Sequence, residues 1–523
     1  MAKFCCKILF AIQLNFVTAD WNHWEVFMSF KRASGILLHP TSLPGPDGIG
    51  DLGPEAYRWI DFLYEAKCHL WQVLPLGPTG YGDSPYQCFS AFAGNPYLIS
   101  PTLLLDQDLL TRFDLNDRPD FPANKVDFGP VINWKLTLLD RAFNNFKNGN
   151  FPELQKAYSS FCNLNADWLD DFALFIAIKE SQGGVSWDNW PENLRTHKVE
   201  TLNSFKQMNS DAIEKHKFRQ FLFYNQWSNL HKYANSKEIQ VIGDIPIFIA
   251  FDSADVWANP ELFYLDDSGK PTVVAGVPPD YFSPTGQLWG NPLYRWDAHQ
   301  KENYAWWVKR FKSVLSTVDI VRLDHFRGFA GYWEIPAGMP TAEIGRWAKG
   351  PGQPFFDSIK SQLGTLPIIA EDLGEITPDV IKLRDDNNLP GMKILQFAFS
   401  ATAADPFLPH NYPKNCVAYT GTHDNDTSVG WYNSAPEKER DFYRRYLSRS
   451  GEDISWDLIR GIWSSVAMFS LCPLQDLLSL GTDARMNYPG KPSGNWGWRF
   501  LPDQIQPYLV LRLKEINSLY SRD

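Results

Sequence analysis

The sequence predicts an α/β protein: a TIM (β/α)8 barrel with a large helical insertion and irregular loop subdomains around its C-terminal face. Two observations support this fold class. Short apolar runs recur from Arg32 onward, each ended by polar, glycine or proline residues, and helical stretches separate many of them. Alternating strands and helices predict a parallel sheet, and eight such units predict that the sheet closes into a barrel.

The eight expected strands are short and contain many β-branched residues, although the last one could equally be helical. In chain order they cover residues 34–39, 70–76, 239–249, 318–325, 366–373, 392–399, 416–421 and 474–480. The helical stretches between them include residues 55–66 and 304–315.

Residues 32–523 are assigned to this barrel, because 523 residues suit an elaborated barrel better than one ordinary domain. A first insertion, at about 100–235, is expected to be mainly helical, since Trp134, Leu138, Ala142 and Phe146 recur four apart. A second insertion, at about 251–295, is rich in proline, glycine, aspartate and aromatic residues. It is expected to form a long ordered loop over the active site.

Residues 1–31 lie outside the strand and helix pattern and are expected to form a disordered N-terminal extension. Lys3 and Lys7 precede an apolar stretch, which imitates a secretion signal. However, Gln13 and Asn15 interrupt that stretch, so the signal-peptide pattern fits poorly.

The bulk composition excludes several classes of protein. A formal net charge of −11 argues against nucleic acid and against an anionic membrane surface as partners. No apolar run reaches the length that spans a bilayer. The seven cysteines have neither the spacing of a disulfide framework nor that of a zinc site, which favours a reducing, cytoplasmic location. The 21 tryptophans modestly favour sugar binding, although a large core also uses aromatic residues.

Acidic residues follow four of the expected strands: Asp244, Asp324, Glu371 and Asp424. A single acid after a strand is often a helix N-cap. Four acids at one rim of a barrel, where catalytic groups gather, are harder to explain in that way, because carboxylates repel one another. Arg322 lies two residues before Asp324, so the two side chains share one face of the strand, and the cation would keep that carboxylate ionised.

Glycosidic chemistry explains such a cluster. A retaining enzyme needs an ionised carboxylate as nucleophile and a protonated acid about 5–5.5 Å away. The spacing alone leaves open whether Glu371 or Asp372 is that acid. His423 could ligate a metal, but it has no partner histidines in a metal-binding pattern, so a hydrogen bond to a sugar hydroxyl is favoured.

The order of three motifs is then recognisable: Arg-Leu-Asp-His-Phe-Arg-Gly from Arg322, Ala-Glu-Asp-Leu-Gly from Ala370, and Thr-His-Asp-Asn from Thr422. It resembles glycoside hydrolase family 77, the amylomaltases or disproportionating enzymes. The likeness continues through the motifs that begin at Gly35, Gly82, Gly243, Gly286 and Ala484, and it covers nearly everything from Arg32 to the last fifteen residues or so.

The resemblance implies a 4-α-glucanotransferase that moves an α-1,4-glucan segment to the 4-hydroxyl of another glucan or of glucose. It implies no cofactor and no metal, and its substrates would be α-1,4-glucans with glucose or maltose. The implied catalytic residues are Asp324 as nucleophile, Glu371 as acid/base and Asp424 as transition-state stabiliser. The implied substrate-binding residues are Tyr81, Ser84, Tyr86, Asp244, Gln287, Trp289, Arg322, His423 and Asn425.

Three other interpretations are carried alongside this one. A metal-dependent barrel hydrolase would need several histidines at strand ends, and few of the 10 histidines lie there. An α-glucan hydrolase of the amylase type would use the same three carboxylates. A non-catalytic glucan-binding protein could retain the aromatic residues without needing all three acids. The loop at 276–294, with Tyr281, Phe282 and Trp289, is expected to hold an acceptor sugar and to exclude water, which would favour transfer over hydrolysis.

Overall fold

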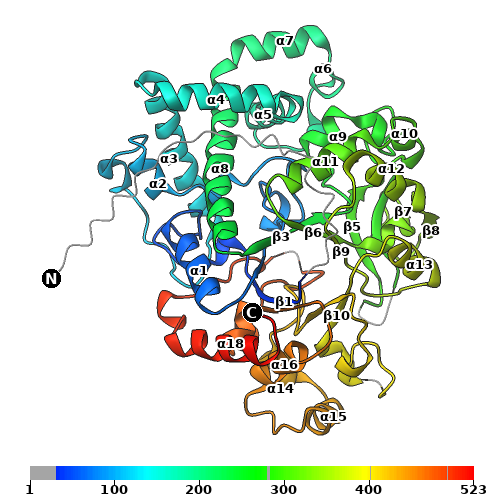
Figure 1. The fold of residues 1–523 in the computed structure, drawn as a ribbon. Helices are drawn as coiled ribbons and strands as arrows, with labels where there is room; N and C mark the ends of the chain where they lie inside the picture. Colours follow the sequence, from blue (N-terminus) through cyan, green and yellow to red (C-terminus); the bar gives the residue numbers. More distant parts are fainter. Residues whose placement is uncertain (1–30, 280–282, 401, 492) are drawn as a thin grey trace, which may run out of the picture.

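A computed structural model describes residues 31–279, 283–400, 402–491 and 493–523 (Figure 1). Eight parallel strands form one sheet in the order β10-β11-β12-β1-β2-β3-β6-β9. The Ala370 amide at the end of β9 donates to the Pro390 carbonyl just before β10, at 2.9 Å, which closes the sheet. The strands are β1 (Ala33–Leu37), β2 (Leu70–Gln72), β3 (Gln240–Pro246), β6 (Ile320–Asp324), β9 (Ile368–Ala370), β10 (Gly391–Ile394), β11 (Cys416–Tyr419) and β12 (Phe469–Pro473).

Helices surround the barrel and extend from it, so the fold is the TIM barrel that the sequence predicts (Figure 1). They are α1 (Pro54–Glu65), α2 (Pro101–Asp106), α3 (Phe128–Asn148), α4 (Pro152–Leu164), α5 (Ala166–Ser181), α6 (Glu192–Arg195), α7 (Val199–Met208), α8 (Ser210–Ser236), α9 (Ala254–Ala258), α10 (Trp296–Lys301), α11 (Ala305–Leu315), α12 (Gln353–Leu363), α13 (Pro378–Asp386), α14 (Ser428–Ser434), α15 (Glu437–Leu447), α16 (Ile454–Trp463), α17 (Leu474–Leu477) and α18 (Pro507–Leu519).

The eighth strand differs from its expected position. It is β12, Phe469–Pro473, whereas the expected segment 474–480 contains the short helix α17. Pro473 explains the boundary: its φ of −62° suits the entry to a helix, and its ring disfavours continuation of a central strand.

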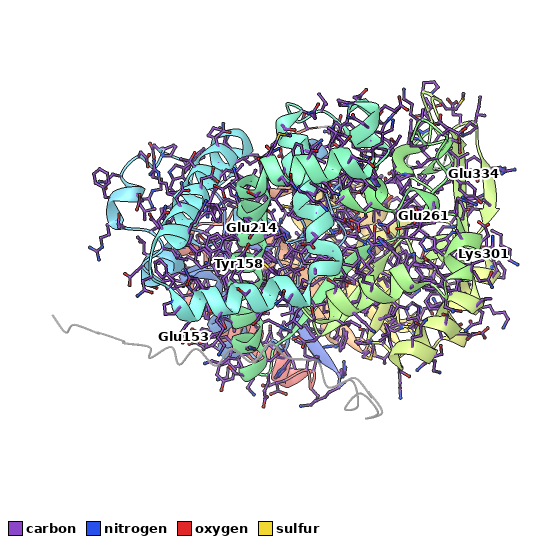
Figure 2. All side chains as sticks on the ribbon, turned by 90° about the horizontal axis from the view of Figure 1, so that it is seen from above. Glu153, Tyr158, Glu214, Glu261, Lys301 and Glu334 are labelled. Carbon is purple, nitrogen blue, oxygen red and sulfur yellow. The ribbon has the colours of Figure 1, made fainter. Side chains whose placement is uncertain are left out.

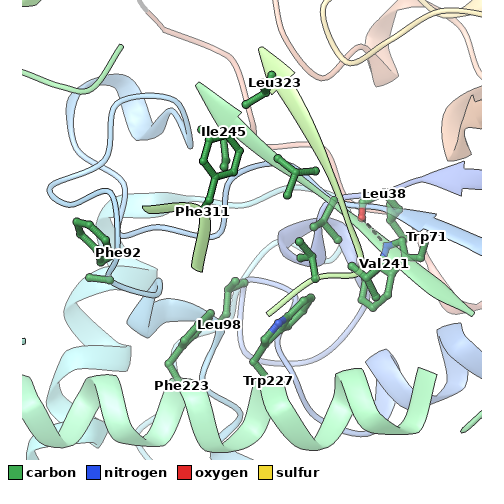
Figure 3. Close-up of a cluster of buried hydrophobic side chains, with 14 of the residues drawn as sticks. Leu38, Trp71, Phe92, Leu98, Phe223, Trp227, Val241, Ile245, Phe311 and Leu323 are labelled. Carbon is green, nitrogen blue, oxygen red and sulfur yellow. Dashed lines mark hydrogen bonds between the residues drawn. The ribbon is translucent and has the colours of Figure 1, made fainter. Parts of the chain in front are cut away.

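The barrel separates two apolar regions. Inside it, side chains from every strand form one cluster, which includes Ile242 of β3 and Ile320 of β6. Outside it, strand residues pack against the helices. Figure 3 shows part of this outer core, where Phe223 and Trp227 of α8 point from the helix into a cluster that includes Leu98 and Val241 of β3. Because side chains alternate along a strand, residues two or four positions after Ile242 or Ile320 also point towards the barrel axis.

The stretch between β2 and β3 contains helices α2 to α8, which include the residues expected to be helical there. The 27-residue helix α8 contacts α1, α3, α4 and α5. Figure 2 labels Tyr158 of α4 and Glu214 of α8 in this region, where the Tyr158 hydroxyl donates to Glu214 Oε2 at 2.5 Å. The helices therefore share one core with the barrel, through α8.

The segment 251–295 is not a loop throughout. It contains α9, β4 (Val273–Val277) and β5 (Gln287–Pro292). These strands join β7 (Gly331–Pro336) and β8 (Arg346–Lys349) in an antiparallel sheet ordered β5-β4-β7-β8. Its glycines and prolines hid the short strands, because they disfavour strands when propensity is judged from sequence alone.

Residues 1–30, to which the expectation of a disordered extension applies, lie outside the described residues, as do Tyr281 and Phe282. None of the described helices combines the length and the apolar character that a bilayer span requires.

Candidate active site

The C-terminal rim of the barrel carries a buried arginine between two carboxylates. Asp244 of β3 pairs in register with Arg322 of β6, and Asp324 ends β6. All three side chains lie on the same strand faces as Ile242 and Ile320, which places them at the inner rim. The backbone register therefore brings together groups that are 78 residues apart in sequence.

Arg322 connects these carboxylates directly. Its Nη2 donates to Asp324 Oδ1 at 2.6 Å, and its Nη1 is ion-paired with Asp244. Burial alone would lower the pKa of Arg322, but the two carboxylates outweigh it and raise that pKa well above its ordinary value. The Asp324 side chain is bound by Arg322 but is 28% exposed, so it remains accessible to a substrate.

Asp244 and Tyr86 form the floor beside this pair. The Tyr86 hydroxyl donates to Asp244 Oδ2 at 2.9 Å, while Asp244 Oδ1 has no hydrogen-bond partner in the described part of the chain. The Tyr86 ring lies parallel to the His423 ring, with their centroids 5.3 Å apart and an angle of 14° between the planes. An aromatic face and a free carboxylate oxygen next to a nucleophile are groups that a sugar ring can use.

Glu371 follows β9 and lies beside the end of β6. Leu323 pairs with Ala370, and the Glu371 amide donates to the Leu323 carbonyl at 3.0 Å, so Glu371 and Asp324 occupy neighbouring strand ends. Backbone amides of His325 and Leu373 donate to its two carboxylate oxygens at 2.7 and 2.9 Å. His325 has φ +53°, a left-handed conformation that is uncommon for residues other than glycine.

The environment of Glu371 favours its protonated form. Burial and the nearby Asp324 carboxylate raise the pKa of Glu371 to about 8, against the opposing effects of Arg322 and the two amides. A carboxyl group with this pKa holds a proton at neutral pH. The site therefore combines a proton donor, Glu371, with a second carboxyl group that Arg322 binds directly.

Asp372, the other candidate acid, is used in the scaffold. It is buried, accepts a hydrogen bond from the Met392 amide at 2.7 Å, and is ion-paired with Arg384 at 2.5 Å. A Cβ at Gly391 would lie 2.4 Å from its Oδ2, so the carboxylate packs tightly against β10. The geometry thus separates the two adjacent acids, with Glu371 at the rim and Asp372 bound to neighbouring structure.

The loop after β11 carries His423 and Asp424. Asn487 Nδ2 donates to Asp424 Oδ1 at 2.6 Å, and Arg485 Nη2 donates to the Asp424 carbonyl at 2.6 Å. His423 Nε2 lies 3.4 Å from Asp424 Oδ2. Burial lowers the pKa of His423, which favours the neutral ring. One carboxylate oxygen of Asp424 is therefore held in place by the Asn487 side-chain amide.

The remaining expected binding residues lie at different depths. Ser84 Oγ accepts a hydrogen bond from the Tyr86 amide at 3.2 Å. Asn425 Oδ1 accepts from Thr422, so that oxygen is used within the loop. Tyr81 is 77% exposed, whereas Arg322 and Asp244 are buried. It therefore stands apart from the group formed by Arg322 and its partners.

Gln287 and Trp289 lie on β5 of the second sheet. Trp289 Nε1 donates to Gln287 Oε1 at 3.2 Å. The Trp289 ring also meets the His325 ring edge-on, with centroids 4.8 Å apart. His325 donates its amide to Glu371, so this contact connects the second sheet with the candidate acid.

Sequence reasoning did not assign a role to Arg485, Asn487 or Trp496. The motif Ala484-Arg-Met-Asn is part of the family resemblance, but the sequence does not predict its position in the fold. Trp496 packs near both Tyr86 and His423, with ring centroids 5.8 and 5.9 Å away. Within the described ranges, no group of three His, Cys, Asp or Glu side chains is arranged to hold a metal ion.

Comparison with known proteins decides the family. The model of glycoside hydrolase family 77, described as 4-alpha-glucanotransferase, matches residues 38–504. The chain belongs to this family. The resemblance of its motifs to family 77 is thereby confirmed, and so is the prediction of an enzyme of the 4-alpha-glucanotransferase kind.

Individual family 77 proteins are similar along nearly the whole chain. A 4-alpha-glucanotransferase of Thermus thermophilus is 52% identical over 503 residues, which covers 95% of this chain and 100% of that protein. A chloroplastic/amyloplastic 4-alpha-glucanotransferase of Solanum tuberosum is 46% identical and covers 94% of this chain and 87% of that protein. A solved amylomaltase of Streptococcus agalactiae, in complex with acarbose, superposes with a TM-score of 0.91 at 41% identity and covers 94% and 100% of the two chains.

Proposed function

We propose that the chain transfers an α-1,4-glucan segment to the 4-hydroxyl of another glucan or of glucose, by a retaining double displacement. Glu371 is the acid/base, Asp324 the nucleophile and Asp424 the stabiliser of the transition state. The observation that carries the proposal is the pairing of unlike carboxyl groups on neighbouring strand ends. Glu371 has a pKa of about 8, and Asp324 is held by Arg322 at 2.6 Å.

In the first step Glu371 gives its proton to the glycosidic oxygen while an oxygen of Asp324 attacks the anomeric carbon. The bond from that carbon to the leaving glucan breaks, and the leaving 4-hydroxyl keeps the proton. The donor segment is then an ester of Asp324. In the second step Glu371 takes the proton of an acceptor 4-hydroxyl, whose oxygen attacks the same carbon and releases Asp324.

The other rim residues bind the donor sugar in this proposal. Asp244 Oδ1 and His423 Nδ1 are buried and lack partners among the described residues, so sugar hydroxyls can complete their hydrogen bonds. Tyr86 supplies an aromatic face, Ser84 supports Tyr86, and Arg322 holds the Asp324 carboxylate in place. Tyr81 is proposed as an outer glucan contact, and Asn425, Gln287 and Trp289 are proposed as further substrate contacts.

A matched assay tests the reaction type. Purified protein incubated with maltotriose should produce glucose together with a ladder of longer glucans, because the ester is passed to another sugar. Glucose and maltose alone would identify the α-glucan hydrolase that is the alternative function. No turnover by the folded protein would contradict both proposals and favour a binding protein.

Trp289 is proposed to favour sugar over water as the acceptor. It contacts His325, whose amide binds Glu371, so it lies close to the acid/base that activates the acceptor. Trp289→Ala should raise the ratio of hydrolysis to transfer, because water enters more readily when an apolar wall is removed. The ratio of reducing-sugar release to longer products measures this effect, and an unchanged ratio would reject the role.

Location and cofactor needs follow from simpler observations. Five cysteines among the described residues are free thiols, which supports a cytoplasmic, reducing location. The proposed chemistry is complete with carboxyl groups and sugar hydroxyls, so no cofactor is included. Residues 32–523 are proposed to form the catalytic unit, with residues 1–31 as an extension of it.

A further inference from the structure

One fully buried carboxylate beneath the rim has no role in the chemistry described above. Asp476 is 0% exposed and lies in the short helix α17, directly after β12. Its Oδ2 accepts hydrogen bonds from Thr420 Oγ1 at 2.6 Å and Ser428 Oγ at 2.8 Å. Its Oδ1 accepts from the Ser428 amide at 2.6 Å. No described Lys, Arg or His forms an ion pair with it. These three hydrogen bonds therefore offset the cost of removing the carboxyl group from water.

The two partners of Asp476 stand at the two ends of the loop that carries His423 and Asp424. Thr420 directly follows β11, and Ser428 is the first residue of α14. The seven residues between these positions, 421–427, are thus tied at both ends to the same carboxylate. A loop fixed at both ends by a buried group has fewer orientations available to its tip.

Gln475, the residue before Asp476, binds a second segment that contacts Asp424, the one that contains Arg485 and Asn487. Gln475 is also buried, and its Nε2 donates to the Ala484 carbonyl at 3.2 Å. Ala484 immediately precedes Arg485, which donates to the Asp424 carbonyl. Asn487, two residues further on, donates to the Asp424 carboxylate. Adjacent side chains therefore hold both segments that meet at Asp424.

We infer that Gln475 and Asp476 are positioning residues for the reaction, which set the place of the Asp424 carboxylate at the rim of the barrel. Both side chains are buried, so they act through Asp424 and not by contact with a substrate. The inference rests on the proposed function, because it needs Asp424 to act in the transition state. A displacement of about 1 Å at a catalytic group can cost on the order of 100-fold in rate, so a buried support of this kind has a measurable effect.

The test compares Asp476→Ala with the conservative Asp476→Asn. The alanine removes both acceptor oxygens and with them all three hydrogen bonds, and we expect kcat to fall by about 10-fold to 100-fold while KM changes by less than about threefold. The asparagine keeps an oxygen for the Ser428 amide, and its nitrogen can donate to the two hydroxyls, so it should restore most of the activity. Circular dichroism and melting temperature establish that each variant is folded.

The matched control is Asp319→Ala at the opposite end of the barrel. Asp319 Oδ2 also has three partners, at 2.7 Å from the Val241 amide, 3.0 Å from Asn235 and 2.9 Å from His231. Asp319 directly precedes β6, far along the strand from the rim. Its alanine variant should lose stability like Asp476→Ala but keep kcat, which separates positioning from general destabilisation.

A double-mutant cycle with Asp424→Asn decides whether Asp476 acts through Asp424. If it does, Asp424→Asn combined with Asp476→Ala should be no slower than Asp424→Asn alone, with an α-maltosyl fluoride donor to keep rates measurable. Additive losses, or an unchanged kcat in folded Asp476→Ala, would overturn the inference. If Asp476→Ala does not fold, Thr420→Val combined with Ser428→Ala removes the two hydroxyl donors and replaces it in the cycle. Full activity of Asp424→Asn would instead contradict the proposed function.

Discussion

Asp324→Asn is expected to lower kcat by on the order of 10⁴-fold or more, because removal of a covalent nucleophile takes away the intermediate itself. The amide is a poor nucleophile and carries no charge to balance the developing oxocarbenium ion. Transfer from maltotriose measures the loss. An activated donor such as α-maltosyl fluoride should not restore the rate, since the missing group is the one that attacks.

Mass spectrometry provides the second measurement for Asp324. The wild-type protein, quenched with acid during turnover of α-maltosyl fluoride, should carry a covalent glycosyl adduct on the peptide that contains residue 324. The Asp324→Asn protein should carry none. An adduct on a different carboxylate would contradict the assignment of the nucleophile, while the Asp319→Asn variant at the other end of β6 should form the adduct normally.

Asp324→Asn has a further electrostatic consequence. Asp324 is one of the two causes that raise the pKa of Glu371, the other being burial. With the carboxylate replaced by a neutral amide, the pKa of Glu371 should fall from about 8. The mutation therefore removes the nucleophile and also changes the acid/base. The measured loss of kcat reports both effects together and not the contribution of Asp324 alone.

Much of the barrel is predictable because each strand is a local signal. Seven of the eight expected runs overlap an observed strand, and the two-residue period of a strand already places Arg322 and Asp324 on one face. The eighth run failed where Pro473 ends β12, although a proline before Leu474 is itself a helix-start signal. The eighth strand was therefore misplaced because the effect of Pro473 on the strand-to-helix boundary was not taken into account.

The second sheet and the supports of Asp424 depend on contacts distant in sequence. Strand β4 pairs with β5 and, across an intervening segment, with β7. The short, glycine-containing sequences of β4 and β5 give no clear period. Asn487 reaches Asp424 from 63 residues away, and Asp476 reaches Thr420 from 56 residues away. A single sequence contains no local pattern that predicts such pairs.

The choice between Glu371 and Asp372 also depends on contacts with residues that are distant in sequence. Adjacent residues along a chain near a strand end point in different directions, but sequence alone does not say which one points to the substrate. The structure places Asp372 between the Met392 amide and Arg384, and it gives Glu371 two amide donors beside Asp324. Partners from β10 and α13 made the distinction, and neither could be assigned to Asp372 in advance.

Glu371→Gln is the second variant with a large expected effect. It should lower kcat on maltotriose by about 10²-fold to 10⁴-fold, because glutamine cannot protonate the leaving oxygen. Unlike Asp324→Asn, it should regain much of the first-step rate with α-maltosyl fluoride, whose fluoride leaves with little need for a proton. Pre-steady-state fluoride release measures that step, and failure of the fluoride donor to help would contradict an acid role for Glu371.

The pH dependence of stability supplies an independent check on Glu371. Its pKa is raised from 4.5 to about 8 in the folded protein, so between these values the unfolded chain releases a proton that the folded chain keeps. The folded wild-type protein therefore loses stability as pH rises from about 4.5 to about 8, and the loss is complete above the folded pKa. Glu371→Gln has no such proton, so its melting temperature relative to wild type should rise across this window.

Asp372→Asn is the matched control for both measurements. It replaces the neighbouring acid, which the scaffold uses through Met392 and Arg384, and it should lower stability without removing the proton donor. The alkaline fall in wild-type kcat/KM, which we expect as Glu371 loses its proton near pH 8, should persist in Asp372→Asn. Loss of that fall in Asp372→Asn, together with its survival in the residual activity of Glu371→Gln, would transfer the acid role to Asp372.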